Sequence, residues 1–523
     1  MTEMLDPLRM HAESNGDGAA VLVDESGGGR PSATTFEELN ATANRCARAF
    51  HTLGGAPGDR LVWCGPNSLE VLTTIHAARK AGMTAVPLSY RFNAEEMRYV
   101  IDNSDATLVV VDSEQAPLVA GIRERLPKVR EVVGFGGELP GGIRPWDEVL
   151  GEESDAEPDM RDTSMGGAQM IYTSGTTGKP KGALRTETDV ALVMALIAEL
   201  RLQPGNEVHL TTGPLYHSGP LAFAILSHTL GGSIVVLRSF DPTSWLRLVK
   251  EHRVTNTFSA PTQLKRLVNL PPGELARADL SSMRCLVANA APVPYALKQE
   301  IVRKLGEGFL FEVYGSTELG IVTVLPPEDQ LRKPGSCGKP YGGVQIKIVR
   351  DDGTEAASDE PGELFIRTAL EMDGYHRSDE TLDEHDDDSG GSGWKSVGDI
   401  ASIDAEGYLS IRDRRTDMII SGGVNIYPAE IENVMHEHPH VLDVAVLGIP
   451  DDEWGERVHA IVQPKPDETV DLDELAAFVD ARVARYKRPR SYEIRESLPR
   501  TPAGKLLKRQ LRDEFWADRA SPV

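Results

Sequence analysis

Cysteine is scarce in this chain of 523 residues, which contains only four. Cys46, Cys64, Cys285 and Cys337 are widely separated, and no two of them form a Cys-x-x-Cys pair. This spacing argues against a disulfide framework and against a cysteine-based metal site. Such a sequence suits a reducing compartment, so we expect a cytoplasmic protein.

Long apolar runs and an excess of positive charge are also missing. The longest apolar run extends from Val190 to Ala198, which is far too short to span a bilayer. The segment from Met1 to Asp6 is acidic and lacks the apolar core of a signal peptide. With a net charge of −25, the surface disfavours nucleic acid and anionic membranes. We therefore expect no nucleic-acid partner and no stable membrane insertion.

Helix-like and strand-like segments alternate along most of the chain. Such alternation predicts parallel β-sheets wrapped by helices, and therefore an α/β fold. A chain of 523 residues is too long for one compact core, so we expect two or more domains. After residue 340 the pattern changes to short strands separated by turns, which indicates a small β subdomain.

A run of alternating charges from Asp413 to Asp417 precedes a last segment that has its own elements. We interpret this segment as a separate α+β domain. The expected division is a large domain over 1–413 and a C-terminal domain over 414–523. Helices are expected over 36–53, 68–81, 242–252, 294–305, 428–438, 472–484 and 506–515. Strands are expected over 60–64, 84–88, 108–111, 168–171, 234–237, 344–349, 362–367, 408–411, 418–420, 441–447 and 458–462.

Three segments are expected to form loops or to lie at the surface. The stretch 134–162 is rich in Gly, Pro and acids, which is typical of a loop. The acids of 383–393 could bind a cation, but a solvated loop is the better interpretation because nothing orders the carboxylates. His436, His438 and His440 have a spacing that does not converge three imidazoles on one metal, so we expect surface histidines.

The densest cluster of glycine, hydroxyl and lysine side chains lies between Tyr172 and Gly182, which include three glycines and two lysines. Glycine lets backbone N–H groups approach a ligand, while hydroxyls and lysines add donors and charge, so the stretch suits a polyphosphate. It is not a Walker loop, because Pro180 follows the first lysine in place of Ser or Thr. The candidate phosphate-binding residues are Thr173, Ser174, Gly175, Thr176, Thr177, Gly178 and Lys179.

This loop resembles the phosphate loop of the adenylate-forming superfamily, which includes acyl-CoA synthetases, luciferases and the adenylation domains of peptide synthetases. The resemblance extends over nearly the whole chain, from about residue 35 to residue 515. It is greatest to the fatty-acid, bile-acid and carnitine-type CoA ligases. It implies that the C-terminal domain is mobile.

A second motif, Tyr314-Gly315-Ser316-Thr317-Glu318, resembles the adenine and magnesium motif of the superfamily. Tyr314 offers an aromatic face for a purine, and Gly315 permits close approach. Thr317 can donate to a phosphate, and Glu318 can hold Mg²⁺ beside phosphate oxygens.

The resemblance alone implies roles for several further residues. These are Ala290 and Ala291 as a second adenine wall, Asp399 and Arg414 on the ribose, Thr173 as a second magnesium ligand, His217 facing the acid, Gly423 lining a tunnel for pantetheine, and Lys505 as the adenylation lysine.

These roles imply two reactions at one site. A carboxylate attacks the α-phosphorus of ATP and pyrophosphate leaves, while Lys505 stabilises the developing charge. The C-terminal domain then rotates, so that a CoA thiol can attack the acyl-adenylate. The implied cofactors are ATP, Mg²⁺ and CoA. The implied partners are a small carboxylic acid and CoA, and a homodimer is left open.

Three positions depart from the superfamily pattern and bear on the second reaction. Thr416 stands where the hinge usually has Asp or Lys, His376 replaces an aromatic residue, and Val397 replaces a threonine. They leave open another acceptor, such as an amine or a carrier protein. Nitrite activation for diazotisation, which a few members of the superfamily carry out, also stays open. A non-catalytic binding module is disfavoured by the intact Lys505 and Glu318. We therefore predict an ATP-dependent acid–CoA ligase, whose acid the sequence does not specify.

Overall fold

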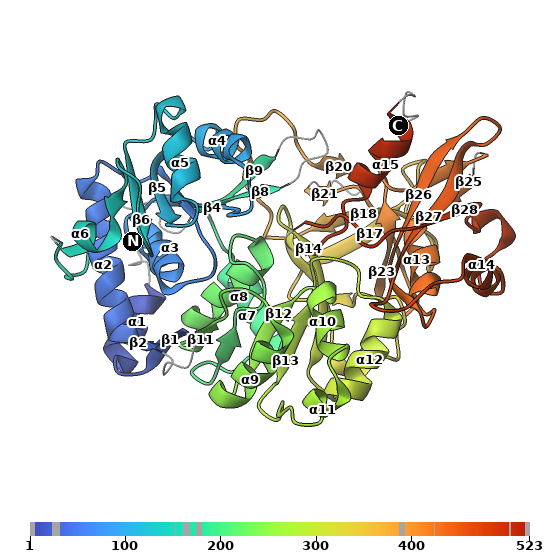
Figure 1. Ribbon diagram of the computed structural model, residues 1–523, viewed down its shortest axis with the longest axis horizontal. Coiled ribbons are helices and arrows are strands. Elements are labelled where there is room, and N and C mark those ends of the chain that lie inside the picture. Colours follow the sequence, from blue (N-terminus) through green and yellow to red (C-terminus); the bar gives the residue numbers. More distant parts are fainter. Residues whose placement is uncertain are drawn as a thin grey trace.

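The computed structural model describes residues 6–23, 32–151, 153–159, 168–173, 180–385, 393–422, 424–501 and 504–517. These residues form four β-sheets of nine, eight, six and five strands, with helices around them. In Figure 1 the chain runs from blue helices at one end of the molecule to red C-terminal elements at the other. The predicted α/β class, with a small α+β unit at the C-terminus, is confirmed.

An eight-stranded sheet lies in the N-terminal part of the molecule. Its strands are β3 (Arg60–Cys64), β4 (Thr84–Leu88), β5 (Ala106–Asp112), β6 (Glu131–Phe135), β7 (Arg144–Pro145), β8 (Gln169–Thr173), β9 (Lys181–Arg185) and β19 (Gly374–Tyr375). The order is β19-β9-β8-β4-β3-β5-β6-β7, and the run from β8 to β7 is parallel. β3 and β5 are almost entirely buried, as expected for strands covered on both faces.

A nine-stranded sheet forms the centre of the molecule. Its strands are β1 (Ala19–Val23), β2 (Ser32–Thr35), β10 (Val208–Leu210), β11 (Ser233–Val236), β12 (Asn256–Ser259), β13 (Cys285–Ala288), β14 (Leu310–Ser316), β15 (Gly320–Leu325) and β16 (Lys339–Pro340). Strands β11, β10, β12, β13 and β14 are neighbours and run parallel. Their carboxyl ends therefore meet at one edge, where α/β sheets bind ligands.

Helices cover both sheets and join their cores. They are α1 (Pro7–Asn15), α2 (Phe36–Thr52), α3 (Leu69–Lys80), α4 (Ala94–Asn103), α5 (Ala116–Ile122), α6 (Trp146–Gly151), α7 (Val190–Glu199), α8 (Ser218–Thr229), α9 (Pro242–His252), α10 (Pro261–Val268), α11 (Pro272–Leu275) and α12 (Tyr295–Leu305). Thr35 begins α2 with a capping box, because its hydroxyl accepts from Glu38 N and Glu38 accepts from Thr35 N. Apolar residues of α2, α3 and α8 pack into one cluster with both sheets.

A six-stranded antiparallel sheet follows. It contains β17 (Gln345–Val349), β18 (Gly362–Arg367), β20 (Asp383–His385), β21 (Trp394–Ser396), β22 (Asp399–Ile403) and β23 (Leu409–Arg414). Asp399 begins β22 and lies opposite Arg414, which ends β23. Strand register therefore brings these two predicted ribose residues together.

The C-terminal part has a sheet and a core of its own. Its elements are β24 (Ile419–Ser421), β25 (Val424–Ile426), β26 (Val441–Asp451), β27 (Gly455–Pro464), β28 (Ser491–Ile494), α13 (Pro428–His436), α14 (Leu472–Asp480) and α15 (Lys508–Trp516). Apolar residues from both faces of this sheet form two clusters that include none of the preceding residues. This arrangement agrees with a domain that begins near residue 414, and the boundary itself stays a prediction.

Three expectations about loops and surfaces were wrong. The supposed loop 134–162 contains β7 and α6, because Trp146, Val149 and Leu150 recur at helical spacing and are buried. Asp383 to His385 form β20 and pair with β21, while 386–392 lie outside the described residues. His438 is only 2% exposed and packs edge-on against Phe478, so it is not a surface histidine.

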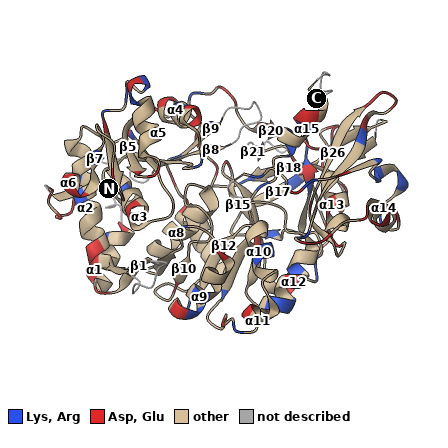
Figure 2. Ribbon diagram, viewed as in Figure 1, with Lys and Arg blue, Asp and Glu red and all other residues tan. Residues whose placement is uncertain are grey.

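Charged side chains are concentrated on the helices and loops. In Figure 2 helices such as α1, α9 and α12 carry blue and red segments, whereas the strands are mostly tan. All four cysteines are buried free thiols. Among the described residues, every helix is too short or too polar to cross a membrane.

Candidate active site

The carboxyl edge of the central sheet brings several predicted site residues together. Tyr314 lies near the end of β14. Ala290 lies just after β13, which is the strand next to β14 in the sheet. Ala290 has a φ of 77°, in the left-handed region that residues with a side chain rarely adopt. Its N–H donates a hydrogen bond to the side-chain oxygen of Asn289. Strain of this kind clusters at ligand sites.

Gly315 is required by the fold as well as by any ligand. β14 and β15 form an antiparallel hairpin whose register shifts between Tyr314 and Gly315. A Cβ at Gly315 would lie 2.1 Å from the carbonyl oxygen of Gly320. The backbone of Gly320 therefore already lies so close to Gly315 that no side chain fits there.

The two ribose candidates form one bonded cluster with the adenine candidate. Arg414 Nε lies 3.2 Å from Asp399 Oδ1, and the Tyr314 hydroxyl donates to Asp399 Oδ2. Asp399 is only 5% exposed. Burial, with the adjacent Asp399 carboxylate, raises the pKa of Tyr314 well above its usual value. Because a carboxylate has about four acceptor sites, Asp399 keeps room for a diol.

Glu318 and Thr317 lie on the turn after β14 and contact three residues that the sequence did not single out. Glu318 Oε1 accepts from the Tyr375 hydroxyl at 3.0 Å. Arg185 Nη2 donates to the backbone oxygen of Thr317 at 3.1 Å. The hydroxyls of Thr317 and Ser218 share a hydrogen bond of 3.1 Å. The turn is thus tied to the phosphate-loop hairpin and to α8.

His217 precedes Ser218 and places a neutral imidazole beside this turn. Burial, aided by the positive charge of Arg91, lowers the pKa of His217 to about 4. Its Nε2 atom is buried and has no hydrogen-bond partner. The next residue, Gly219, lies against the ring of Phe258 in β12, because a Cβ there would come within 2.4 Å of Phe258 Cζ. An unpartnered imidazole nitrogen beside an apolar wall can hydrogen-bond a ligand.

Lys505 belongs to the C-terminal part, yet its side chain lies close enough to the cluster on the large domain to be affected by the charges there. Burial and the nearby Arg414 guanidinium lower the pKa of Lys505 to about 8, while Asp399 and Glu318 act in the opposite direction. Its loop is closed by Thr501, whose hydroxyl accepts from Lys505 N at 3.0 Å. Gly504 has a φ of 85° and lies against Thr262 at the start of α10. A cation on a loop of the C-terminal part is therefore placed among the nucleotide-binding candidates.

Part of the predicted phosphate loop lies outside the described residues, namely Ser174, Gly175, Thr176, Thr177, Gly178 and Lys179. Its two ends are described: Thr173 of β8 pairs with Lys181 of β9. Gly423 also lies outside the described residues, between β24 and β25. Ala291 follows Ala290 in the loop after β13, whereas Gly315 and Ser316 are the last two residues of β14.

The missed residues had weak signals in the sequence. Arg185 ends the strand that follows the phosphate loop, and Ser218 directly follows His217. Tyr375 stands in the same tripeptide as His376. Nothing in the local sequence marks these three residues, because their contacts with Thr317 and Glu318 arise only in the folded chain.

A cavity of about 290 Å³ adjoins the Lys505 loop. It is lined by Arg91, Arg238 and Arg266 of the large domain and by Thr501 and Gly504 of the C-terminal domain. Its wall is therefore rich in positive charge, although the protein as a whole is acidic.

Comparison with known proteins agrees with this geometry. The AMP-binding enzyme family matches residues 8–376, and the AMP-binding enzyme C-terminal domain matches residues 430–505. The chain belongs to the AMP-binding enzyme family. The first match alone spans more than half of the sequence.

Similar proteins support a more specific assignment. A feruloyl-CoA synthase from Amycolatopsis sp. is 36% identical over 92% of this chain and 94% of its own length. The long-chain-fatty-acid–CoA ligase FadD13 from Mycobacterium tuberculosis is 35% identical over 92% and 93%. The crystal structure of ATP-bound MatB from Rhodopseudomonas palustris matches with a TM-score of 0.83 and 27% identity, over 98% of this chain and 99% of that one. This AMP-binding enzyme is accordingly an AMP-forming acyl-CoA synthetase that uses ATP, Mg²⁺ and CoA.

The oxygen donors near Glu318 suit a magnesium ion that takes few ligands from the protein. Glu318 keeps one carboxylate oxygen beyond the one that Tyr375 occupies, and nearby hydroxyls supply further hard oxygen donors. The described residues contain no group of three or more His, Cys, Asp or Glu side chains that could hold a metal by themselves. Magnesium commonly takes one or two protein ligands and completes its shell with phosphate oxygens.

Proposed function

We propose that this enzyme activates a monocarboxylic acid with an apolar body as its adenylate and then transfers the acyl group to CoA. The observation that carries the proposal is Lys505, a lysine with a pKa near 8 that lies beside Asp399, Arg414 and Glu318. A buried cation among groups suited to a nucleotide serves a reaction that builds negative charge.

The nucleotide is held from three sides in this proposal. Asp399 and Arg414 bind the ribose hydroxyls, while Tyr314, Ala290 and Ala291 enclose the adenine. Thr317 and the loop 173–179 bind the phosphates. Glu318 and Thr173 would hold Mg²⁺, which would supply charge neutralisation at the phosphate oxygens.

The first reaction needs little covalent help from the protein. A carboxylate oxygen of the acid bonds to the α-phosphorus of ATP, and the bond to the pyrophosphate oxygen breaks. Lys505 is placed to donate to the oxygens between the carboxylate and the α-phosphate, where charge develops. Positioning and charge stabilisation therefore supply most of the acceleration.

The acid side of the site favours an apolar substrate. Phe258 and Phe223 pack with ring centroids 5.3 Å apart, and Gly219 lies against Phe258. His217 is neutral above pH 5 and offers one ring nitrogen rather than a second positive charge. An aryl acid, such as the ferulate in the name of one relative, and a fatty acid, as in the name of another, both meet these requirements.

The second reaction uses the C-terminal domain in another orientation. Rotation about the segment at Thr416 withdraws Lys505 and brings Gly423 to the adenylate. The thiol of CoA then bonds to the acyl carbon, AMP leaves, and the thiol proton passes to solvent. The cavity supports CoA as acceptor, because the cations of Arg91 and Arg266 suit a phosphate-bearing cosubstrate. Arg238 of the same wall is already paired with Asp112 and Glu114.

A pyrophosphate-release screen tests the proposal. The wild-type enzyme is supplied with ATP, Mg²⁺ and either an aryl acid, a fatty acid, a dicarboxylate or nitrite, each with and without CoA. We expect release with apolar monocarboxylates and faster turnover with CoA. Release that CoA never accelerates would leave adenylation standing but point to an amine or carrier-protein acceptor. A cytoplasmic location and a homodimer stay predictions.

A further inference from the structure

Two arginines fasten the segment between the domains, one on each side of Thr416. Before it, Arg415 Nη1 lies 3.0 Å from Glu363 Oε2, and its Nη2 lies 3.1 Å from Asp383 Oδ2. After it, Arg512 Nη1 donates to the Thr416 carbonyl oxygen at 3.0 Å. Glu363 and Asp383 belong to the large domain, whereas Arg512 belongs to α15.

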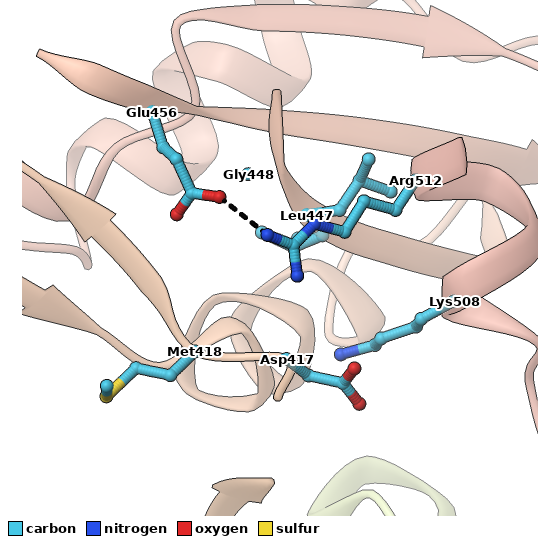
Figure 3. Close-up of a pocket in the computed structure, with 8 residues that line it drawn as sticks. Asp417, Met418, Leu447, Gly448, Glu456, Lys508 and Arg512 are labelled. Carbon is cyan, nitrogen blue, oxygen red and sulfur yellow. Dashed lines mark hydrogen bonds and ion pairs between the residues drawn. The ribbon is translucent and has the colours of Figure 1, made fainter. Parts of the chain in front are cut away.

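Arg512 is itself anchored inside the C-terminal domain. Its Nη2 donates to Glu456 Oε1 at 3.0 Å, and Glu456 is only 2% exposed. Figure 3 shows Arg512 and Lys508 extending side by side from α15 toward the segment at Asp417 and Met418. The peptide after Thr416 is therefore held to one domain and Arg415 to the other, so rotation concentrates at the backbone of Thr416.

Asp413 makes side-chain contacts that cross this pivot. It ends the large-domain side, in β23, and is 8% exposed. Its Oδ2 accepts from Ala429 N at 3.1 Å and lies 3.9 Å from Lys508 Nζ. Ala429 and Lys508 both lie beyond Thr416, so a rotation there must separate them from Asp413.

We propose that Asp413 is a positioning residue that holds the C-terminal domain in the orientation in which Lys505 reaches the nucleotide site. This inference rests on the proposed two-orientation cycle. Lys508 also lies 2.8 Å from Glu432 Oε1, within its own domain. Release of Asp413 therefore does not leave Lys508 as an unpaired buried charge. The contacts of Asp413 with Ala429 and Lys508, which we call the latch, can thus open and close.

Glu432 supplies a matched control, because its ion pair with Lys508 has the same chemistry but does not cross the pivot. Asp413→Asn and Glu432→Gln are compared in both half-reactions: pyrophosphate release, and thioester formation from chemically prepared acyl-adenylate plus CoA. We expect Asp413→Asn to lower the ratio of the first rate to the second about tenfold. Glu432→Gln should lower the melting temperature and leave the ratio unchanged. Equal loss of both reactions in Asp413→Asn, or the same ratio shift in both variants, would overturn the proposal.

A distance measurement separates this proposal from the assignment of function. Fluorophores on Lys250→Cys and Asp473→Cys report the separation of the domains, and the four native cysteines are buried. Asp413→Asn should broaden or shift the wild-type distance distribution, and Glu432→Gln should not. This readout needs no turnover, so it decides the latch even if no acid proves to be a substrate. An unchanged distance distribution in Asp413→Asn would overturn the positioning role of Asp413 and leave the proposed function untouched.

Discussion

The ribose side of the site and the Lys505 loop are held in place in different ways. Asp399 lies on a strand, is bonded to Tyr314 and Arg414, and is almost fully buried. Lys505 lies on a short loop whose own bonds, such as that to Thr501, are local. The proposed binding groups are thus fixed before any ligand arrives, whereas the proposed catalytic cation is delivered by a separate domain. A group delivered in this way can also be withdrawn.

Removing the delivered cation should have the largest effect. Lys505→Ala is expected to lower pyrophosphate release by about 10²–10³-fold or more, because one well-placed charged donor contributes on this scale. The same variant should form thioester from prepared acyl-adenylate and CoA at nearly the wild-type rate. Lys465→Ala, another lysine of the C-terminal domain, is the control. Equal damage to both reactions would mean that the two regions do not differ as described.

Glu318 tests the fixed region through its proposed role as a magnesium ligand. Glu318→Gln keeps the shape of the side chain but removes its charge, so turnover at limiting Mg²⁺ should fall at least about tenfold, or about 1.4 kcal/mol in barrier. Excess Mg²⁺ should recover part of the loss. Tyr375→Phe removes only the hydroxyl that donates to Glu318 and should have a smaller effect. Rates that do not depend on Mg²⁺ differently from wild type would remove Glu318 from the metal site.

Asp399 tests the same region through binding alone. Ribose contacts are similar in the ground state and the transition state, so Asp399→Ala should raise KM for ATP several-fold, with a smaller change in kcat. Tyr314→Phe keeps the ring and removes the hydroxyl that donates to Asp399, so it should show a milder increase. A fall in kcat at unchanged KM would contradict the ribose role.

Sequence reasoning predicted the helices, the strands and the ribose candidates better than the long-range contacts around them. β3, β4, α9 and β18 begin and end where the residue patterns indicated, because apolar spacing and caps are local signals. The motif residues Asp399 and Arg414 were named correctly as neighbours, since strand register brings them together. Their roles toward ATP stay predictions.

Long-range packing explains what the sequence did not predict. Trp146 was assigned to a loop because Gly and Pro surround it, yet its ring packs against Phe135 and a helix forms. His438 looked like a surface residue until Phe478 of α14 covered it. Arg185 and Tyr375 became site residues only where separate strands met Thr317 and Glu318. No local pattern carries such contacts.

The smallest predicted effect is a pH dependence that compares the two regions in one profile. The pKa of Lys505 is lowered to about 8, and the lysine acts as a cation. Its charge is complete well below pH 8 and is lost as pH rises through that value, so kcat/KM for ATP should fall by about twofold at pH 8.

His217 should add no limb of its own to that profile above pH 5, because burial keeps its pKa near 4. The kcat profile should decline at a higher pH than kcat/KM, since bound phosphates favour the charged lysine. Lys505→Arg keeps a positive charge at all these pH values, so whatever activity it retains should lose the decline above pH 8. A decline that persists in Lys505→Arg would assign the titration to another group. The charge of Lys505 would then not be what the pH profile reports.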